Sequence, residues 1–271
     1  MENDLEYLLD VFYDAKEYGS ILKVKKINFE LIEKRLIELK NEAPEDIFKL
    51  QYREKILEII PGLVKQGKIM SDKYDAMITN PPYMGSGGMN GTLSNFVRKE
   101  YPDTKGDLFA VFMELDEHLV KPKGCMAMIN QHSWMFLSSF EKYRMRLLES
   151  RTIDTMLHLG PRAFEEIGGE VVQSTAFVNR KIRLGEYRGT YIRLVDYNNA
   201  DLKEEKTLEA VLNPDVDYRY TSRTDNFSKI PGSPVAYWAS DTTISLFKNK
   251  KLCEYGQTRL GLATSNNEKF I

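Results

Sequence analysis

Apolar residues in the first part of the chain recur three and four positions apart, with charged residues between them. This spacing predicts amphipathic helices. A further apolar cluster stops at Pro61-Gly62, which predicts the end of a helix at that point. We therefore expect residues 1–70 to be a helical segment that covers a sheet. The first two helices are defined by Leu5, Leu8, Leu9 and Phe12, and by Phe29, Ile32, Leu36 and Leu39.

The pattern changes at Tyr74. Residues 74–79 form a short apolar run that reaches two prolines, which is too short for a helix and is typical of a buried parallel strand. The glycine-rich stretch 85–91 follows and resembles a loop that can move over a pocket. Asp107 then opens a helix whose apolar face ends before Pro122.

Strands and helices alternate in the middle of the chain, which predicts a parallel α/β sheet. The last two predicted strands lie close together in sequence and indicate an antiparallel hairpin added at the sheet edge. After residue 200 the pattern weakens and indicates loops and short elements. The predicted elements are a buried strand at 125–130, a helix at 138–150 and strands at 155–159, 171–178 and 190–195.

The composition is typical of a folded chain, with 271 residues of which 42% are hydrophobic and 29% charged. No apolar stretch approaches the roughly 20 residues of a membrane helix, and the acidic start differs from a signal peptide, so we expect a cytoplasmic protein. The net charge of −2 does not indicate a nucleic-acid binder, so any DNA contact must be local. The two cysteines and three histidines lack metal-ligand spacing, and no metal is predicted.

Candidate chemistry lies in Asn80-Pro81-Pro82-Tyr83, directly after the strand at 74–79. Ligands bind at the carboxyl ends of strands in open α/β sheets. The two prolines fix the backbone and remove two N–H donors, so the turn presents carbonyl acceptors. The Asn80 side-chain oxygen and the Pro81 carbonyl can each accept a hydrogen from an exocyclic amine, which aims the nitrogen lone pair at a methyl donor. Tyr83 can stack on an aromatic base that has left the duplex.

This tetrapeptide resembles the catalytic motif of the amino-methyltransferases that use S-adenosylmethionine. Asp107-Leu108-Phe109 is similar to the segment that lines the cofactor and base pocket in that superfamily, so the resemblance implies that Asn80, Asp107 and Phe109 contact the cofactor. Several segments between residues 75 and 271 resemble PglX, the adenine-specific methyltransferases of BREX phage-defence systems. These segments are 159–160, 163–164, 168–178, 230–234, 236–238 and 261–264.

The resemblance implies a Rossmann-like methyltransferase sheet in the C-terminal half, N6-methylation of adenine in double-stranded DNA, and other defence proteins as partners. It also implies that an aromatic residue before the late hairpin packs on the flipped base, and Phe164 is the matching position. A core phenylalanine beside Ile167 is the alternative. We expect a helical segment at 1–70, a catalytic subdomain at 71–200, and a connector toward a target-recognition region at 201–271.

One feature of such enzymes is missing before Asn80. They hold the cofactor on a glycine-rich loop and bind its ribose with an acidic residue, both N-terminal to the catalytic motif. We therefore expect this chain to be a piece of a larger protein, with too few contacts to bind S-adenosylmethionine or methylate DNA alone.

Basic residues interleaved with tyrosines follow the strand predicted at 171–178. Arg180, Lys181, Arg183 and Arg188 can contact DNA phosphates. A solvated hairpin face is the other explanation of these charges.

Two other functions remain open. Protein glutamine N5 methyltransferases use the same Asn-Pro-Pro-Tyr motif, because an amide nitrogen also has a delocalised lone pair. They end soon after the late hairpin, whereas this chain continues well past Val195, which favours DNA as the substrate. A non-catalytic DNA or protein interaction module of methyltransferase fold is the third possibility, and the missing cofactor loop favours it.

Overall fold

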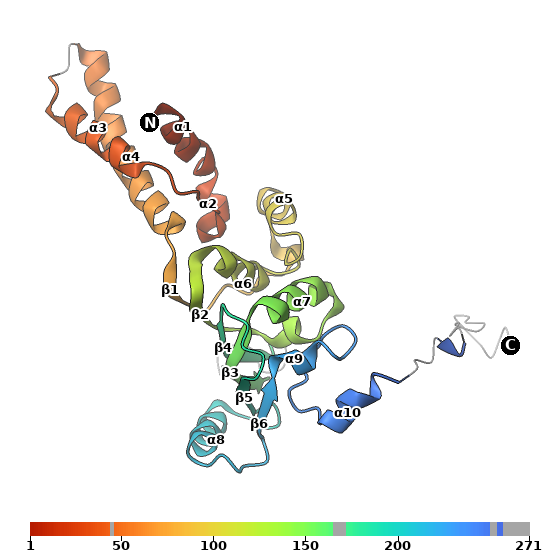
Figure 1. Ribbon diagram of the computed structural model, residues 1–271. Helices are drawn as coiled ribbons and strands as arrows, with labels where there is room; N and C mark the ends of the chain where they lie inside the picture. Colours follow the sequence, from red (N-terminus) through yellow and green to blue (C-terminus); the bar gives the residue numbers. More distant parts are fainter. Residues whose placement is uncertain (44–45, 165–171, 250–253, 257–271) are drawn as a thin grey trace, which may run out of the picture.

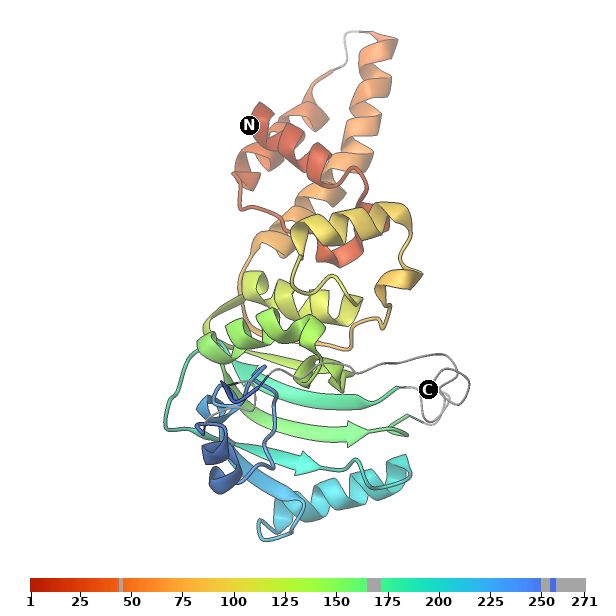
Figure 2. The same ribbon diagram turned by 90° about the vertical axis from the view of Figure 1, so that its right-hand side faces the viewer.

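The N-terminal residues form a helical part that extends away from a β-sheet (Figures 1 and 2). The computed structural model describes residues 1–43, 46–164, 172–249 and 254–256. None of the helices in these ranges is long and apolar enough to span a membrane. The helices of the first part are α1 (Glu2–Val11), α2 (Ala15–Tyr18), the 3-10 turn η1 (Gly19–Ile21), α3 (Phe29–Asn41) and α4 (Ile47–Ser71).

The predicted helices are present, but they do not cover the sheet. Their apolar stripes face one another and form a separate core around Leu8, Phe29 and Val64, to which none of the described strand residues contributes. The expectation of a helical layer over the sheet is wrong, because the apolar stripes of these helices are buried against one another within the helical part.

Helix α4 continues through Pro61, where the sequence predicted an end. A proline inside a helix removes one hydrogen bond and crowds the preceding turn. Close packing beyond the proline accounts for the continuation: a Cβ atom at Gly67 would lie only 2.9 Å from the Phe29 ring and 3.0 Å from Leu8. Glycine at this position lets α4 approach both α1 and α3, and their contact continues past the proline.

The second part is a six-stranded mixed sheet with the strand order β1-β2-β4-β3-β5-β6. Strands β1 and β2 are parallel, as are β3 and β5, while β4 runs antiparallel between β2 and β3, and β6 runs antiparallel to β5. The strands β1, β2, β3 and β5 therefore all end at one side of the sheet, which we call the carboxyl edge. The strands are β1 (Tyr74–Thr79), β2 (Val120–Gln131), β3 (Thr152–Gly160), β4 (Ser174–Arg180), β5 (Arg188–Arg193) and β6 (Arg219–Arg223).

The α/β fold class is confirmed, with two corrections to the strands. The predicted hairpin of the last two strands at the sheet edge is wrong, because β4 is inserted between β2 and β3, whereas β5 lies on the far side of β3. Strand β1 has the predicted bounds but is not buried, because it is the terminal strand and one of its faces is uncovered.

Helices cover one face of the sheet and leave much of the other open. On the covered face, α6 (Leu108–Leu119) and α7 (Glu141–Ser150) contribute to the main core together with Met126, Met156 and Phe177. On the open face, α8 (Ala200–Leu212) is the one described helix, and it packs beside β5. The remaining elements are η2 (Ser86–Gly88), α5 (Gly91–Glu100), η3 (His132–Met135), η4 (Ser138–Phe140), α9 (Thr224–Phe227) and α10 (Asp241–Leu246).

Helix α8 and strand β6 lie where the sequence indicated only loops and short elements. The buried side of α8 carries a lysine, Lys203, where an amphipathic helix has an apolar residue. Its ammonium group donates hydrogen bonds to the carbonyls of Leu159 at 2.6 Å and Leu194 at 2.7 Å. The charged residue interrupts the apolar pattern, which is why the helix was not recognised.

Candidate active site at the carboxyl edge of the sheet

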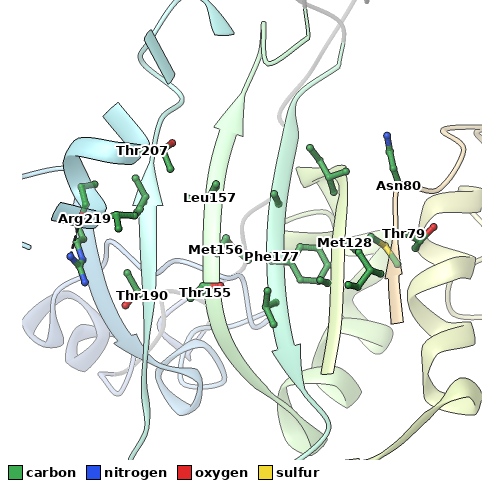
Figure 3. A pocket seen from close by; sticks show the side chains of 18 residues that line it. Thr79, Asn80, Met128, Thr155, Met156, Leu157, Phe177, Thr190, Thr207 and Arg219 are labelled. Atoms are coloured by element: carbon green, nitrogen blue, oxygen red, sulfur yellow. Dashed lines mark hydrogen bonds between the residues drawn. The ribbon is translucent and has the colours of Figure 1, made fainter. Parts of the chain in front are cut away.

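The Asn-Pro-Pro-Tyr turn begins where β1 reaches the carboxyl edge. Asn80 is exposed and stands at the end of the strand (Figure 3), Pro81 is buried, and Tyr83 is half-buried. The Asn80 side chain makes no hydrogen bond to any described residue, so its amide oxygen is available to a ligand. The buried proline fixes the backbone from which that side chain extends.

The turn is fastened to the start of α6. The Asp107 carboxylate accepts hydrogen bonds from the backbone N–H groups of Met84 at 3.1 Å and Phe109 at 3.3 Å, and Leu108 N–H donates to the Met84 carbonyl at 3.0 Å. Asp107 is the N-terminal cap of α6, as its position in the sequence predicted. Burial raises the pKa of Asp107, and the backbone N–H donors partly offset that rise. One side chain thus caps a helix and holds the motif turn.

Tyr83 is supported from behind by Phe109. The two rings meet edge to face, with centroids 6.4 Å apart at 84°, and Phe109 also lies 5.7 Å from the Phe140 ring. Phe109 is fully buried, so the structure gives it a supporting position and not an exposed one beside a cofactor. Burial raises the pKa of Tyr83 and the nearby Ser174 hydroxyl partly offsets this, so the phenol is neutral at physiological pH.

A cluster of histidines and aromatic rings at the same edge was not found from the sequence. His132 follows the end of β2, and its Nδ1 lies 2.8 Å from Nε2 of His158 in β3. The Nδ1 atom of His158 lies 2.9 Å from the Tyr237 hydroxyl. The rings of Phe136 and Trp238 lie 6.0 Å and 6.4 Å from the His158 ring. These residues come from three separate segments of the chain, 132–136, 158 and 237–238, which the fold brings together.

The histidine cluster is uncharged at neutral pH. Burial lowers the pKa of His158 to about 3, with smaller contributions from nearby positive groups, and burial also lowers the pKa of His132. Among the described residues, no group of three or more histidine, cysteine, aspartate or glutamate side chains is placed so that it could hold a metal ion. The carboxyl edge therefore carries a neutral and largely buried aromatic cluster beyond the motif turn.

Phe164 lies on the chain that leaves the carboxyl edge after β3, and it is half-buried. Because β3 is the fourth strand in the sheet order and β1 the first, this loop begins about 14 Å from the motif turn at the usual strand spacing. Its packing on a flipped base stays a prediction. Ile167, its alternative neighbour, lies outside the described residues, as do the segments 168–171 and 261–264.

The basic residues expected to contact DNA lie at the opposite edge of the sheet. Arg180 ends β4 and Arg188 begins β5, about 20 Å from the carboxyl edge for a strand of this length. Arg180 is paired with Asp154 at 2.7 Å, Arg183 is paired with an aspartate, and the Lys181 ammonium donates to two backbone carbonyls. The structure thus separates them from the motif turn and engages three of the four within the chain.

An apolar groove of about 840 Å³ runs from Asn80 across the open face toward α8 (Figure 3). Of the three residues expected to contact S-adenosylmethionine, only Asn80 borders this groove, because Phe109 is buried and the Asp107 carboxylate is bonded to the backbone. Of the described residues expected to contact S-adenosylmethionine, Asn80 therefore provides the one open contact, and these residues do not line a site for the whole molecule.

The chain belongs to the Eco57I restriction-modification methylase family, whose sequence profile matches residues 7–164, more than half of the chain. It is 46% identical over 272 residues to the adenine-specific methyltransferase PglX of Lacticaseibacillus casei (strain Zhang), covering 99% of this chain and 22% of that protein. It is 43% identical over 239 residues to the adenine-specific methyltransferase BrxX of Escherichia coli O9:H4 (strain HS), covering 88% and 19%. The chain spans about a fifth of the length of these curated relatives.

Solved structures of restriction-modification proteins are also similar to the chain. The match to a type I restriction-modification methyltransferase subunit from Streptococcus thermophilus covers 59% of this chain and 37% of that protein, with 20% identity and a TM-score of 0.43. A second match is to a structure of a type I restriction-modification system, solved to explain its complex assembly and conformational transition. It covers 90% of this chain and 58% of that protein, with 12% identity and a TM-score of 0.47.

Proposed function

We propose that this chain forms the target-base side of a DNA adenine N6 methyltransferase of the PglX type, which uses S-adenosylmethionine and marks host DNA in phage defence. The observation that carries the proposal is the exposed Asn80 at the end of β1, in a turn fastened to α6. The identity of 46% to an adenine-specific methyltransferase over nearly the whole chain supports the choice of substrate.

The chemistry follows from the acceptors of the turn. An adenine amine is a weak nucleophile, because its nitrogen lone pair is delocalised into the ring. When the Asn80 side-chain oxygen and the Pro81 carbonyl accept its two hydrogens, the nitrogen becomes more tetrahedral and its lone pair points away from the ring. Bound S-adenosylmethionine would supply the methyl group on that side. Asn80 then stabilises the positive charge that develops on the nitrogen during transfer.

The aromatic residues at the carboxyl edge suit a base that has been turned out of the duplex. Tyr83 is neutral, and Phe109 holds its ring in place. Stacking on such a ring contributes about 1–3 kcal/mol per base and pays part of the cost of unstacking. In this proposal residues 71–200 carry the catalytic subdomain and 201–271 connect it to a target-recognition region.

The test is the substitution Asn80→Ala in the complete enzyme that contains this chain. We expect methyl transfer to DNA to fall at least about 100-fold, or about 2.7 kcal/mol of transition-state stabilisation, with folding and DNA binding retained. Asn213→Ala is the matched control, since it removes the same group at an exposed turn after α8 and should leave turnover unchanged.

Tritium from labelled S-adenosylmethionine identifies the substrate in the same assay. Label in the N6 position of adenine supports the proposal. Label in a glutamine of release-factor protein would instead identify a protein N5 methyltransferase, and wild-type turnover of Asn80→Ala would remove the proposed role of the turn.

A further inference from the structure

Two segments that the sequence singled out, 230–234 and 236–238, have no part in the chemistry proposed above. The second of them ends in Trp238, which is 43% exposed, whereas Trp134, the other tryptophan of the chain, is fully buried. The indole N–H of Trp238 makes no hydrogen bond to any described residue. Tryptophan combines a large apolar surface with one hydrogen-bond donor, and an exposed tryptophan whose donor is unused is typical of a binding surface.

Rings behind Trp238 fix the orientation of its indole. The Tyr237 ring meets it edge to face with centroids 4.9 Å apart, and the His158 ring lies 6.4 Å away at 21° to it. The half-buried Phe136 ring lies beside it at 5.8 Å. Tyr237 and His158 are both buried, so Trp238 and Phe136 are the open part of the cluster. We call these two rings the aromatic platform.

A buried arginine fastens the loop that carries Trp238. Arg144 is 1% exposed, and its guanidinium donates to the carbonyls of Gly232 at 3.2 Å and Ser233 at 3.0 Å. It also donates to the Leu137 carbonyl at 2.9 Å, which joins the loop to the segment that carries the other ring of the platform. Ser233 has a φ of 49°, in the left-handed region that residues other than glycine rarely adopt. Such a conformation persists only where its surroundings fix it, and it is most frequent at functional sites.

Lys105 supplies a positive charge at the same edge of the sheet. It is exposed, and its ammonium group forms no ion pair with a described residue. The next residue, Gly106, lies against the platform segment, because a Cβ atom there would be 3.7 Å from the Phe140 ring. The Gly106 carbonyl accepts a hydrogen bond from the Ser86 N–H at 2.9 Å, close to the motif turn. Open aromatic planes beside a cation are the two elements of a surface that binds unpaired nucleic-acid bases and their phosphates.

We propose that the aromatic platform of Trp238 and Phe136 stacks on a DNA base that becomes unpaired or unstacked when the target base leaves the duplex, and that Lys105 contacts a phosphate nearby. The inference rests on the proposed function. The base is not the target itself. Trp238 packs on His158 of β3, three strand positions and about 14 Å from β1 at the usual spacing, so a base stacked there cannot place its amine at Asn80. Stacking of this second base lowers the cost of turning the target out.

Tryptophan fluorescence tests the platform in the 271-residue chain, because its two tryptophans differ in exposure. A single-stranded oligothymidylate of about 12 nucleotides should quench the emission of Trp238, which is the part that Trp238→Phe lacks, and leave that of the buried Trp134 unchanged. An abasic oligomer of the same length should bind without quenching.

The affinity of the oligothymidylate separates stacking from folding. Trp238→Ala should weaken binding about 5- to 150-fold, the range for loss of one stacked base, and should melt like the wild type because the position is open. Trp238→Phe, which keeps a ring, should retain most of the affinity. Tyr52→Ala is the matched control: this tyrosine is 69% exposed on α4, and its removal should leave the affinity unchanged.

Two further measurements assign the phosphate contact and the base. Lys105→Ala should reduce the slope of log affinity against log salt concentration by about 0.7, the value for one phosphate of a single strand, and Trp238→Ala should not change this slope. In the complete enzyme, bound to the DNA that it methylates, an abasic position opposite the target adenine or next to it should abolish the effect of Trp238→Ala. The position that does so identifies the base.

Several outcomes would overturn the proposal. Equal quenching by the abasic oligomer, or an effect of Trp238→Ala that survives both abasic positions, would exclude stacking on a base. No quenching by either oligomer would indicate a protein contact, and quenching by S-adenosylmethionine alone would assign the platform to the cofactor. Base-dependent quenching without methyl transfer to DNA would leave the platform standing and remove the proposed function, whereas methyl transfer without such quenching would do the reverse.

Discussion

The buried histidine pair predicts that the protein loses stability in mild acid. His158 is only 5% exposed, lies between the Tyr237 hydroxyl and His132, and has its pKa lowered to about 3 by burial. A histidine in the unfolded chain has a pKa near 6.5. Between these two values the unfolded state binds a proton that the folded state does not. The stabilisation is therefore fully present above about pH 6.5 and is lost as the pH falls toward 3.

The magnitude follows from the width of that window. Each pH unit costs about 1.4 kcal/mol per proton, so lowering the pH from 7 to 5 removes about 2 kcal/mol from the free energy of unfolding. This figure depends on the unfolded pKa alone, because pH 5 lies well above the folded value. His132, whose pKa burial also lowers, contributes with the same sign.

Urea unfolding at pH 7 and pH 5 measures the effect. Between pH 7 and pH 5, the free energy of unfolding of His158→Gln, which keeps a hydrogen-bonding side chain, should fall by about 2 kcal/mol less than that of the wild type. Tyr237→Phe removes the hydroxyl partner but keeps both histidines, so it should lower stability at both pH values and leave their difference unchanged. The carboxylates are the same in all three proteins, so their contribution to the pH difference cancels when the proteins are compared. An identical pH difference in wild type and His158→Gln would refute the assignment.

Three further outcomes are expected. Asp107→Ala should lower the free energy of unfolding by about 1 kcal/mol in melting experiments and reduce methyl transfer by the complete enzyme, whereas Asp107→Asn, an equally good cap, should keep both near the wild-type values. Low turnover of the asparagine variant would show that the carboxylate has another role. Phe164→Ala should weaken binding of a flipped 2-aminopurine base by about 1–3 kcal/mol and change the melting temperature little. The control Phe109→Ala, at a fully buried position, should lower the free energy of unfolding by about 3–5 kcal/mol. A comparable loss of stability in Phe164→Ala would show that Phe164 is a core residue. The chain alone should bind S-adenosylmethionine poorly in calorimetry, since Asn80 is the one expected contact that borders the groove; a dissociation constant in the low micromolar range would contradict this.

The sequence predicted those elements whose local pattern of apolar and polar residues matches the way they pack in the fold. Strand β1 was found with its observed bounds because a short apolar run ends at two prolines. Helix α6 was found because Asp107 caps a clear apolar stripe. Helix α8 was missed because Lys203 occupies its buried side, and the continuation of α4 past Pro61 depends on a contact between Gly67 and Phe29 that no local pattern contains.

The same limit applies to the candidate site. The motif turn and its helix cap lie within a short stretch of sequence, so both were predictable. The His132–His158 contact and the placement of Arg180 at the opposite edge depend on β4 being inserted antiparallel between β2 and β3. A one-strand change in that order would move each of these side chains relative to Asn80, and the strand order is not encoded in the spacing of the residues themselves.

The motif turn and the outer side of β1 differ in how they are held. The acceptors of the motif turn are fixed by contacts within this chain, through the Asp107 carboxylate and the backbone pair of Met84 and Leu108. Acceptors that stabilise developing charge are effective only when they are already in place, because reorganising them during the reaction costs free energy. The outer side of β1, by contrast, has no such contacts among the described residues. In the proposed function, the acceptors of the turn are therefore in place before the target amine binds.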